Sequence, residues 1–67
     1  MFIAVITELG HRAWVNPKLV THVYEINSNE FSIYFLNDES FLKIDAEECH
    51  RFLDLCQAMY EEEVKNV

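Results

Sequence analysis

Metal binding is the first chemistry to consider, because the chain has three histidines and two cysteines. Zinc sites hold their ligands in close pairs, such as Cys-x2-Cys with a second pair downstream. Cys49 and Cys56 have six residues between them, and His50 points about 100° around the predicted helix from Cys49. His11 and His22 lie on a predicted turn and a predicted strand. The sequence therefore predicts no metal site and two buried, reduced thiols.

A catalytic cysteine is also not expected, because an activated thiolate needs a lowered pKa and a cleft. Cys49 lies near the N-terminus of the predicted helix, which favours the thiolate, but Glu47 and Glu48 oppose it. The Cα atoms of Cys49 and Cys56 would be about 10 Å apart in one helix, and a disulfide needs about 4.4–6.8 Å. A chain of 67 residues is too short to build a pocket of about 300 Å3 beside its core.

Acid–base and phosphate chemistry have equally little support. The paired carboxylates, Asp38-Glu39 and Glu47-Glu48, are neighbours on a turn or a helix and do not converge on one point. A single glycine, Gly10, cannot build a phosphate-binding loop. We therefore expect a protein that is not an enzyme and has no cofactor.

Aromatic side chains are better candidates for function, because Trp and Tyr are enriched among the residues that dominate interface energies. Trp14 lies on a short predicted strand, opposite the residues that would face the core. Tyr24 and Tyr34 lie on two further predicted strands, and Leu55 widens the apolar stripe of the predicted helix. We predict that these four residues bind protein, with ordinary sheet packing as the alternative for the aromatic residues.

The charge of the chain limits its partners. The formal net charge is −7, and the five Lys and Arg residues are scattered along the sequence. Nucleic-acid binding and attraction to an anionic membrane both require clustered basic residues. We expect neither partner. The longest apolar run, residues 1–6, is far shorter than a membrane span, and the pattern suggests a cytoplasmic protein.

Acidic residues gather on one face of the predicted helix, at Glu47, Asp54 and Glu61. Their simplest role is to keep a small protein soluble. They could also contact a basic partner protein. The alternative function is an acidic phage or mobile-element inhibitor that mimics nucleic acid and blocks a host enzyme, and its binding would weaken steeply with salt.

The order of elements follows from periodicity and turn residues. The strands are expected at residues 1–7, 12–15, 20–26, 31–36 and 41–44. Gly10 suits a hairpin turn, and Asn16-Pro17 ends the second strand in a single helical turn. In residues 20–26, Val20, His22 and Tyr24 should share one face.

The helix is expected over residues 45–62, where apolar residues recur at three- and four-residue spacing. Asp45 and Glu48 fit a capping box, in which Asp45 accepts from a first-turn amide and Glu48 reaches back to the Asp45 amide. The acids at residues 61–63 oppose the helix dipole and favour fraying beyond Tyr60.

These elements predict one α+β domain over residues 1–67, an antiparallel meander of four to five strands (residues 1–44) with the helix packed on one face. One helix cannot cover a sheet that is apolar on both sides, and a core this small gains from a partner subunit. The uncovered surface predicts a homodimer or a protein partner.

Three segments carry a family resemblance: Gly10, the run Trp14-Val15-Asn16-Pro17-Lys18-Leu19-Val20, and Ile33-Tyr34-Phe35-Leu36-Asn37. Over about residues 3–56 the chain resembles the small flagellar-operon swarming-motility proteins of the FlbD type. It departs from them at Asn37-Asp38, where the family commonly has Asn-Gly, and at Lys43-Ile44-Asp45, where the family has a Val-x-Glu step. The resemblance implies this fold and an accessory, non-enzymatic role.

The sequence therefore favours a cytoplasmic protein-binding accessory or regulatory module that self-associates. The acidic inhibitor is the alternative.

Overall fold

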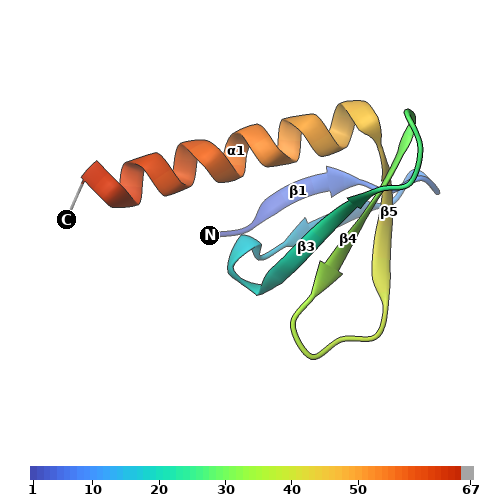
Figure 1. Ribbon diagram of the computed structural model, residues 1–67, viewed down its shortest axis with the longest axis horizontal. Helices are drawn as coiled ribbons and strands as arrows, with labels where there is room; N and C mark the ends of the chain where they lie inside the picture. Colours follow the sequence, from blue (N-terminus) through green and yellow to red (C-terminus); the bar gives the residue numbers. More distant parts are fainter. Residues whose placement is uncertain (66–67) are drawn as a thin grey trace.

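The computed structural model describes residues 1–65, which form five antiparallel strands and one C-terminal α-helix. The elements in chain order are β1 (Ile3–Ile6), β2 (Arg12–Val15), the 3-10 turn η1 (Pro17–Leu19), β3 (Val20–Glu25), β4 (Glu30–Phe35), β5 (Phe41–Asp45) and α1 (Ala46–Lys65). Helix α1 lies along one side of the strands (Figure 1). This confirms the predicted α+β class.

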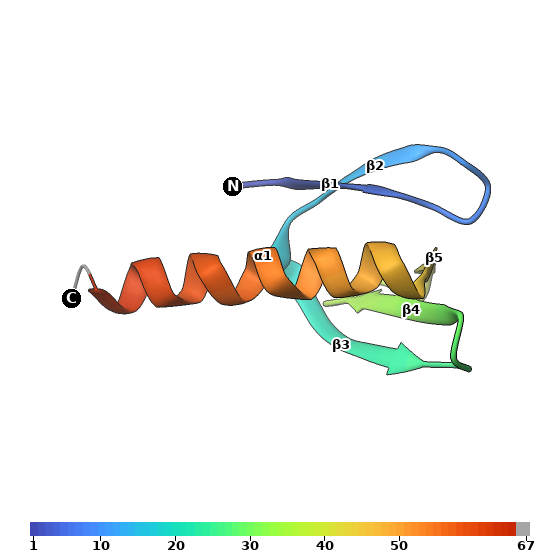
Figure 2. The ribbon, with the colours of Figure 1, turned by 90° about the horizontal axis from the view of Figure 1, so that it is seen from above.

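The strands form two sheets instead of the single meander that we predicted. β1 pairs with β2, and β3, β4 and β5 form a separate sheet in sequence order. Seen from above, β1 and β2 lie to one side of the line of α1, and β3 and β4 lie to the other (Figure 2). The division occurs at η1, where Asn16 Oδ1 accepts a 3.0 Å hydrogen bond from the amide of Lys18 and Pro17 occupies the first helical position. This turn redirects the chain, so β3 cannot fold back onto β2 as a hairpin strand.

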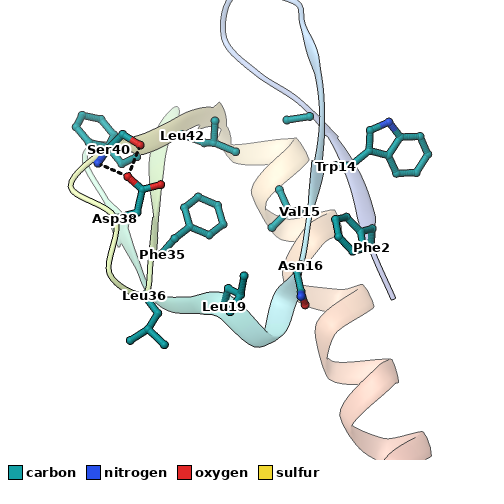
Figure 3. Close-up of a pocket in the computed structure, with 12 residues that line it drawn as sticks. Phe2, Trp14, Val15, Asn16, Leu19, Phe35, Leu36, Asp38, Ser40 and Leu42 are labelled. Atoms are coloured by element: carbon teal, nitrogen blue, oxygen red, sulfur yellow. Dashed lines mark hydrogen bonds between the residues drawn. The ribbon is translucent and has the colours of Figure 1, made fainter.

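One backbone hydrogen bond joins the turn after β1 to the larger sheet, and a second extends the pairing of β3 with β4. The amide of Glu8 donates to the carbonyl of Lys43 at 3.0 Å, and the amide of Leu36 donates to the carbonyl of Leu19 at 2.8 Å. Glu8 follows β1 and Lys43 lies in β5, so the first bond links the two sheets. Leu19 directly precedes Val20, which pairs with Phe35, so the second bond continues the β3–β4 ladder. A gap remains between the two sheets on the side away from α1 (Figure 3).

The core is formed by the inner faces of both sheets and one face of α1. Its buried apolar residues are Ile3, Val5, Val15, Phe31, Ile33, Ile44, Cys49 and Phe52. Cys49 and Phe52 come from the apolar stripe of the predicted helix, and Phe31 and Ile33 come from β4. Because so few side chains are fully buried, much apolar surface is left outside the core.

Two details of the predicted elements are wrong. The register of β3 shifts between Val20 and His22, so the simple alternation in residues 20–26 fails: Val20 and Val23 pack on the core, and His22 and Tyr24 are exposed. A bulge adds one residue to a strand and reverses the faces that follow it. The helix also continues to Lys65, three residues past its predicted end.

The capping box is half confirmed. Asp45, the last residue of β5, accepts a 2.8 Å hydrogen bond from the amide of Glu48. The carboxylate of Glu48 turns away from Asp45 and accepts from the amide of Ile6 in β1. Tertiary packing therefore replaces the predicted local bond with one to a strand that lies 42 residues earlier.

Candidate functional site

One concave surface of the described residues is the gap between the two sheets, which we call the inter-sheet groove. It has a volume of about 460 Å3 and is lined by Phe2, Ala13, Trp14, Val15, Asn16, Leu19, Phe35, Leu36, Asp38, Ser40, Phe41 and Leu42. Figure 3 draws these side chains with α1 behind them: Val15, Phe35 and Leu42 lie on one side of β2, and Trp14 points to the other side. Our expectation that so short a chain could not build a pocket of this size is therefore wrong. The groove lies between the two sheets, and the buried residues of the core remain packed together beneath it.

The floor of the groove is continuous with the core. Val15 is 3% exposed, and Phe35 and Leu42 are half-buried and pack against the core cluster. Val15 lies on β2, whereas Phe35 and Leu42 come from the other sheet. Both sheets thus contribute inward-facing side chains to the floor, which gives it a rigid apolar surface.

The rim of the groove consists of large apolar side chains that remain exposed: Phe2, Trp14, Leu19, Leu36 and Phe41. Trp14 is 63% exposed and Leu36 is 57% exposed. Phe2 precedes β1 and lies near Trp14 in Figure 3. An exposed Trp beside other large apolar residues is the composition that protein interfaces favour.

A short loop fixes the side of the rim that belongs to the larger sheet. Asn37 adopts a positive φ of 60°, which Asn tolerates better than most residues. Asp38 Oδ1 then accepts from the amide of Ser40 at 2.9 Å and from its hydroxyl at 2.7 Å. These bonds, first the one from the amide and then the one from the hydroxyl, lower the pKa of the Asp38 carboxyl and favour its charged form. The loop therefore places one fixed negative charge beside Leu36 and Phe41.

The outer face of the larger sheet carries a row of aromatic rings, His22, Tyr24, Tyr34 and Phe41, which we call the aromatic row. His22 and Phe41 lie directly opposite Tyr34 on the neighbouring strands. The Tyr34 ring stacks on His22 at 4.6 Å and on Phe41 at 5.2 Å, between ring centroids. Tyr24 meets His22 and Tyr34 edge to face. Because Phe41 belongs to both features, the aromatic row continues the rim of the inter-sheet groove.

The residues predicted to bind protein fall into three places. Trp14 lies on the rim of the inter-sheet groove, and Tyr24 and Tyr34 lie in the aromatic row. Leu55 lines a separate apolar hollow of about 420 Å3 between α1 and β1, which shares Phe2 with the groove. The acids lie exposed on α1 and line none of these surfaces; they are Glu47, Asp54 and Glu61.

Sequence reasoning missed four rim residues: Phe2, Leu19, Leu36 and Phe41. Alternation along the strand predicted at residues 31–36 puts Leu36 on the same face as Tyr34, so its exposure could have been inferred. Phe2 and Phe41 were assigned only to strands, and only the two-sheet arrangement brings them to one rim. Leu19 follows Pro17 in η1, and no sequence signal indicated that the turn would border a groove.

The surroundings of both thiols favour their protonated form. Burial raises the pKa of both Cys49 and Cys56, which disfavours the thiolate. Over residues 1–65, no three His, Cys, Asp or Glu side chains lie close enough together to hold a metal ion. Within the same range, α1 lacks the apolar length that a membrane-crossing helix requires.

Comparison with known proteins gives no relative. No family model, no curated protein and no solved structure matches this chain. The resemblance to the FlbD-type proteins therefore stays a prediction, and the functional argument depends on the geometry of the inter-sheet groove.

Proposed function

We propose that this protein is a small, non-enzymatic protein-binding module of the accessory or regulatory kind, which self-associates through the inter-sheet groove. The observation that carries the proposal is the rim of exposed large apolar side chains around a concave, rigid floor. Contiguous apolar patches of several hundred Å2 on soluble domains commonly mark binding sites.

The area of the groove suits a second copy of the chain. A standard interface buries about 800 Å2 on each partner, which is about one sixth of the 5040 Å2 accessible surface of this protein. The five rim side chains expose on the order of 500 Å2 between them. The neighbouring polar residues Asn16 and Ser40 and the aromatic row supply the remainder, with a polar edge of the usual kind.

The charge distribution favours the same arrangement. Each copy has a formal net charge of −7, so two copies repel unless their acidic surfaces are kept apart. Among the residues that the structure describes, Asp38 is the one charged residue that lines the groove. Because α1 lies behind the groove, two copies that meet groove to groove place their acidic helices on opposite outer sides (Figure 3). Ionic screening over about 8 Å then removes most of the repulsion.

The small core gives a thermodynamic reason for association. A domain of this length buries only about 60% of the surface of its unfolded chain, and several exposed apolar residues of this protein adjoin the groove. Burying Trp14 and Leu36 against a second copy stabilises the folded state by mass action. Stability should therefore rise with protein concentration.

Molecular mass measured by sedimentation equilibrium, from low to high micromolar concentration, tests the proposal. We expect a dimer for the wild type and a monomer for the double variant Trp14→Ser/Leu36→Ser. Leu9→Ser is the matched control, because Leu9 is 75% exposed and lies outside the groove. A wild type that stays monomeric at high micromolar concentration contradicts the self-association, as does a dimer that the double variant leaves intact.

The acidic-inhibitor alternative has less support from the helix geometry. Glu47, Asp54 and Glu61 recur every seven residues, which places them about 10 Å apart along α1. Double-stranded DNA carries one charge per about 1.7 Å of axis. These three charges alone reproduce little of the charge density of nucleic acid, and the other acids of α1, Glu48, Glu62 and Glu63, lie outside this row. The acidic-inhibitor alternative is tested by reversing the charge of Glu47, Asp54 and Glu61. It predicts that this variant no longer binds a nucleic-acid enzyme that the wild type binds.

A further inference from the structure

A second exposed apolar surface lies on α1, away from the inter-sheet groove. The C-terminal half of α1 extends past the ends of the strands in both Figure 1 and Figure 2. Leu53, Tyr60 and Val64 are 40%, 62% and 54% exposed. We call these three residues the helix seam. They border the buried residues Cys49 and Phe52 of the same helix, on the side turned toward solvent.

The helix seam is a straight apolar line. Its residues are separated by seven and by four positions, which places them within about 40° of one another around the helix axis. They extend over 11 positions, or about 16 Å of helix. Spacing of this kind is the pattern by which one helix packs against another.

A groove runs beside the helix seam. It has a volume of about 300 Å3 and lies between α1 and the segment formed by η1 and β3. Leu53, Cys56 and Tyr60 form one wall, and Pro17 and Val23 form part of the other. Grooves lined by apolar residues on both sides receive the apolar face of an amphipathic helix.

Acidic residues border the helix seam on both sides. Asp54 and Glu61 follow Leu53 and Tyr60 directly in sequence, on the solvent side, and Glu63 lies on the groove side. The ion pairs over residues 1–65 are Lys18–Glu63, at 4.0 Å, and Arg51–Glu48. Asp54 and Glu61 therefore have no cationic partner among the described residues. A second copy of this chain would bring the same acids against them and be repelled.

We infer that the helix seam docks a basic amphipathic helix of a different protein, with apolar residues at i, i+3 or i+4, and i+7 and with Lys or Arg on either side. The apolar residues of that helix contact Leu53, Tyr60 and Val64, and its cations lie against Asp54 and Glu61. This surface is distinct from the inter-sheet groove. It can be occupied whether or not the protein self-associates.

A peptide titration tests the inference. The probe is a synthetic helical peptide with Leu at the i, i+3, i+4 and i+7 positions and Lys elsewhere, and its affinity is measured by calorimetry at low and at physiological salt. The comparison peptide has Glu in place of Lys. The double variant Tyr60→Ser/Val64→Ser removes apolar surface without changing the charge, and Leu9→Ser is the same kind of change on a distant turn.

We expect the Lys peptide to bind and the Glu peptide not to bind. The Tyr60→Ser/Val64→Ser variant should bind the Lys peptide about tenfold more weakly or worse, and Leu9→Ser should bind it as the wild type does. Equal affinity of the wild type and the Tyr60→Ser/Val64→Ser variant would mean that exposed charge alone attracts the peptide and would overturn the inference. Absence of binding to the Lys peptide would also overturn it.

The Trp14→Ser/Leu36→Ser variant separates the two proposals. If the inference holds, this variant binds the Lys peptide with unchanged affinity, because its substitutions lie in the inter-sheet groove. Loss of peptide binding in this variant would place the peptide in the groove and contradict the helix seam as its site.

Discussion

The backbone amide of Ile6 in β1 donates a 3.0 Å hydrogen bond to the carboxylate of Glu48 in the first turn of α1. Arg51, one turn later, donates to the carbonyl of Ala4 and to the same Glu48 oxygen. Ala4 and Ile6 are alternate residues of β1, so their polar backbone groups point to the same edge. Glu48 and Arg51 thus occupy the positions that a neighbouring strand would take, and they protect an edge that could otherwise pair with another chain.

Removing the carboxylate should therefore weaken the fold and open the edge. We expect Glu48→Ala to lower the free energy of unfolding by about 1–2 kcal/mol, because the amide of Ile6 loses a charged acceptor. Glu47→Ala, on the exposed side of the same turn, should stay within about 0.5 kcal/mol of the wild type. Urea denaturation followed by circular dichroism measures both. Equal losses in the two variants would contradict this role of Glu48.

Acid should destabilise the protein through the same contact. The hydrogen bond with Arg51, and secondly that with the amide of Ile6, hold the pKa of Glu48 below its ordinary value of 4.5. A carboxyl whose pKa is lower in the folded state contributes its stability above the unfolded pKa and loses it as pH falls through the folded pKa. The free energy of unfolding should thus decline as pH falls below about 4.5.

The Glu48→Gln variant isolates this contribution from those of the other carboxyls. Its free energy of unfolding should decline less steeply than that of the wild type as the pH falls, because the group that takes up the proton is absent. Urea midpoints measured across the acid range give both slopes, and identical slopes for Glu48→Gln and the wild type would mean that the contact does not titrate with folding.

Residue type and local periodicity predicted the elements and the exposure of Trp14, because both depend on neighbours in the sequence. Alternation on a four-residue strand was enough to place Trp14 opposite the core. Asn16-Pro17 was also read correctly as the end of β2. These features need no information about distant segments.

Long-range packing decides the rest. The inter-sheet groove exists because η1 turns the chain out of the β1–β2 sheet and brings Phe2, Leu36 and Phe41 to one rim. Glu48 was assigned to a local bond with the Asp45 amide. In the structure its carboxylate accepts from the amide of Ile6 instead. The bulge before His22 changes which β3 side chains are exposed, and turn chemistry gave no signal of it.

The loop between β4 and β5 offers a test of backbone strain. Asn37 is the non-glycine residue with a positive φ among residues 1–65. Alanine in this conformation costs about 1–2 kcal/mol, so Asn37→Ala should destabilise the protein by about that amount. Asn37→Gly should be neutral within about 0.5 kcal/mol, because glycine adopts a positive φ freely. Thermal or urea unfolding compares the two, and a glycine variant as unstable as the alanine variant would show that the Asn37 side chain matters more than its backbone.

The aromatic row should stabilise the larger sheet through Tyr34, whose ring contacts His22, Tyr24 and Phe41. Cross-strand aromatic pairs contribute up to about 1 kcal/mol each, and Tyr34 is the central member of the row. We expect Tyr34→Leu to lower the free energy of unfolding by about 1 kcal/mol or more at low micromolar concentration, where association contributes least.

Tyr60→Leu is the matched control for the aromatic row, because Tyr60 is 62% exposed on α1 and lies outside the row. It should change the free energy of unfolding by less than about 0.5 kcal/mol. If the two leucine variants unfold at the same urea concentration, the rings of the row do not stabilise the sheet. Sheet packing would then not explain why the rings of the row are placed together on the surface, and this result would favour a binding role for Tyr24 and Tyr34. If only Tyr34→Leu is destabilised, the row is explained by sheet packing, and the inter-sheet groove is left as the surface for self-association.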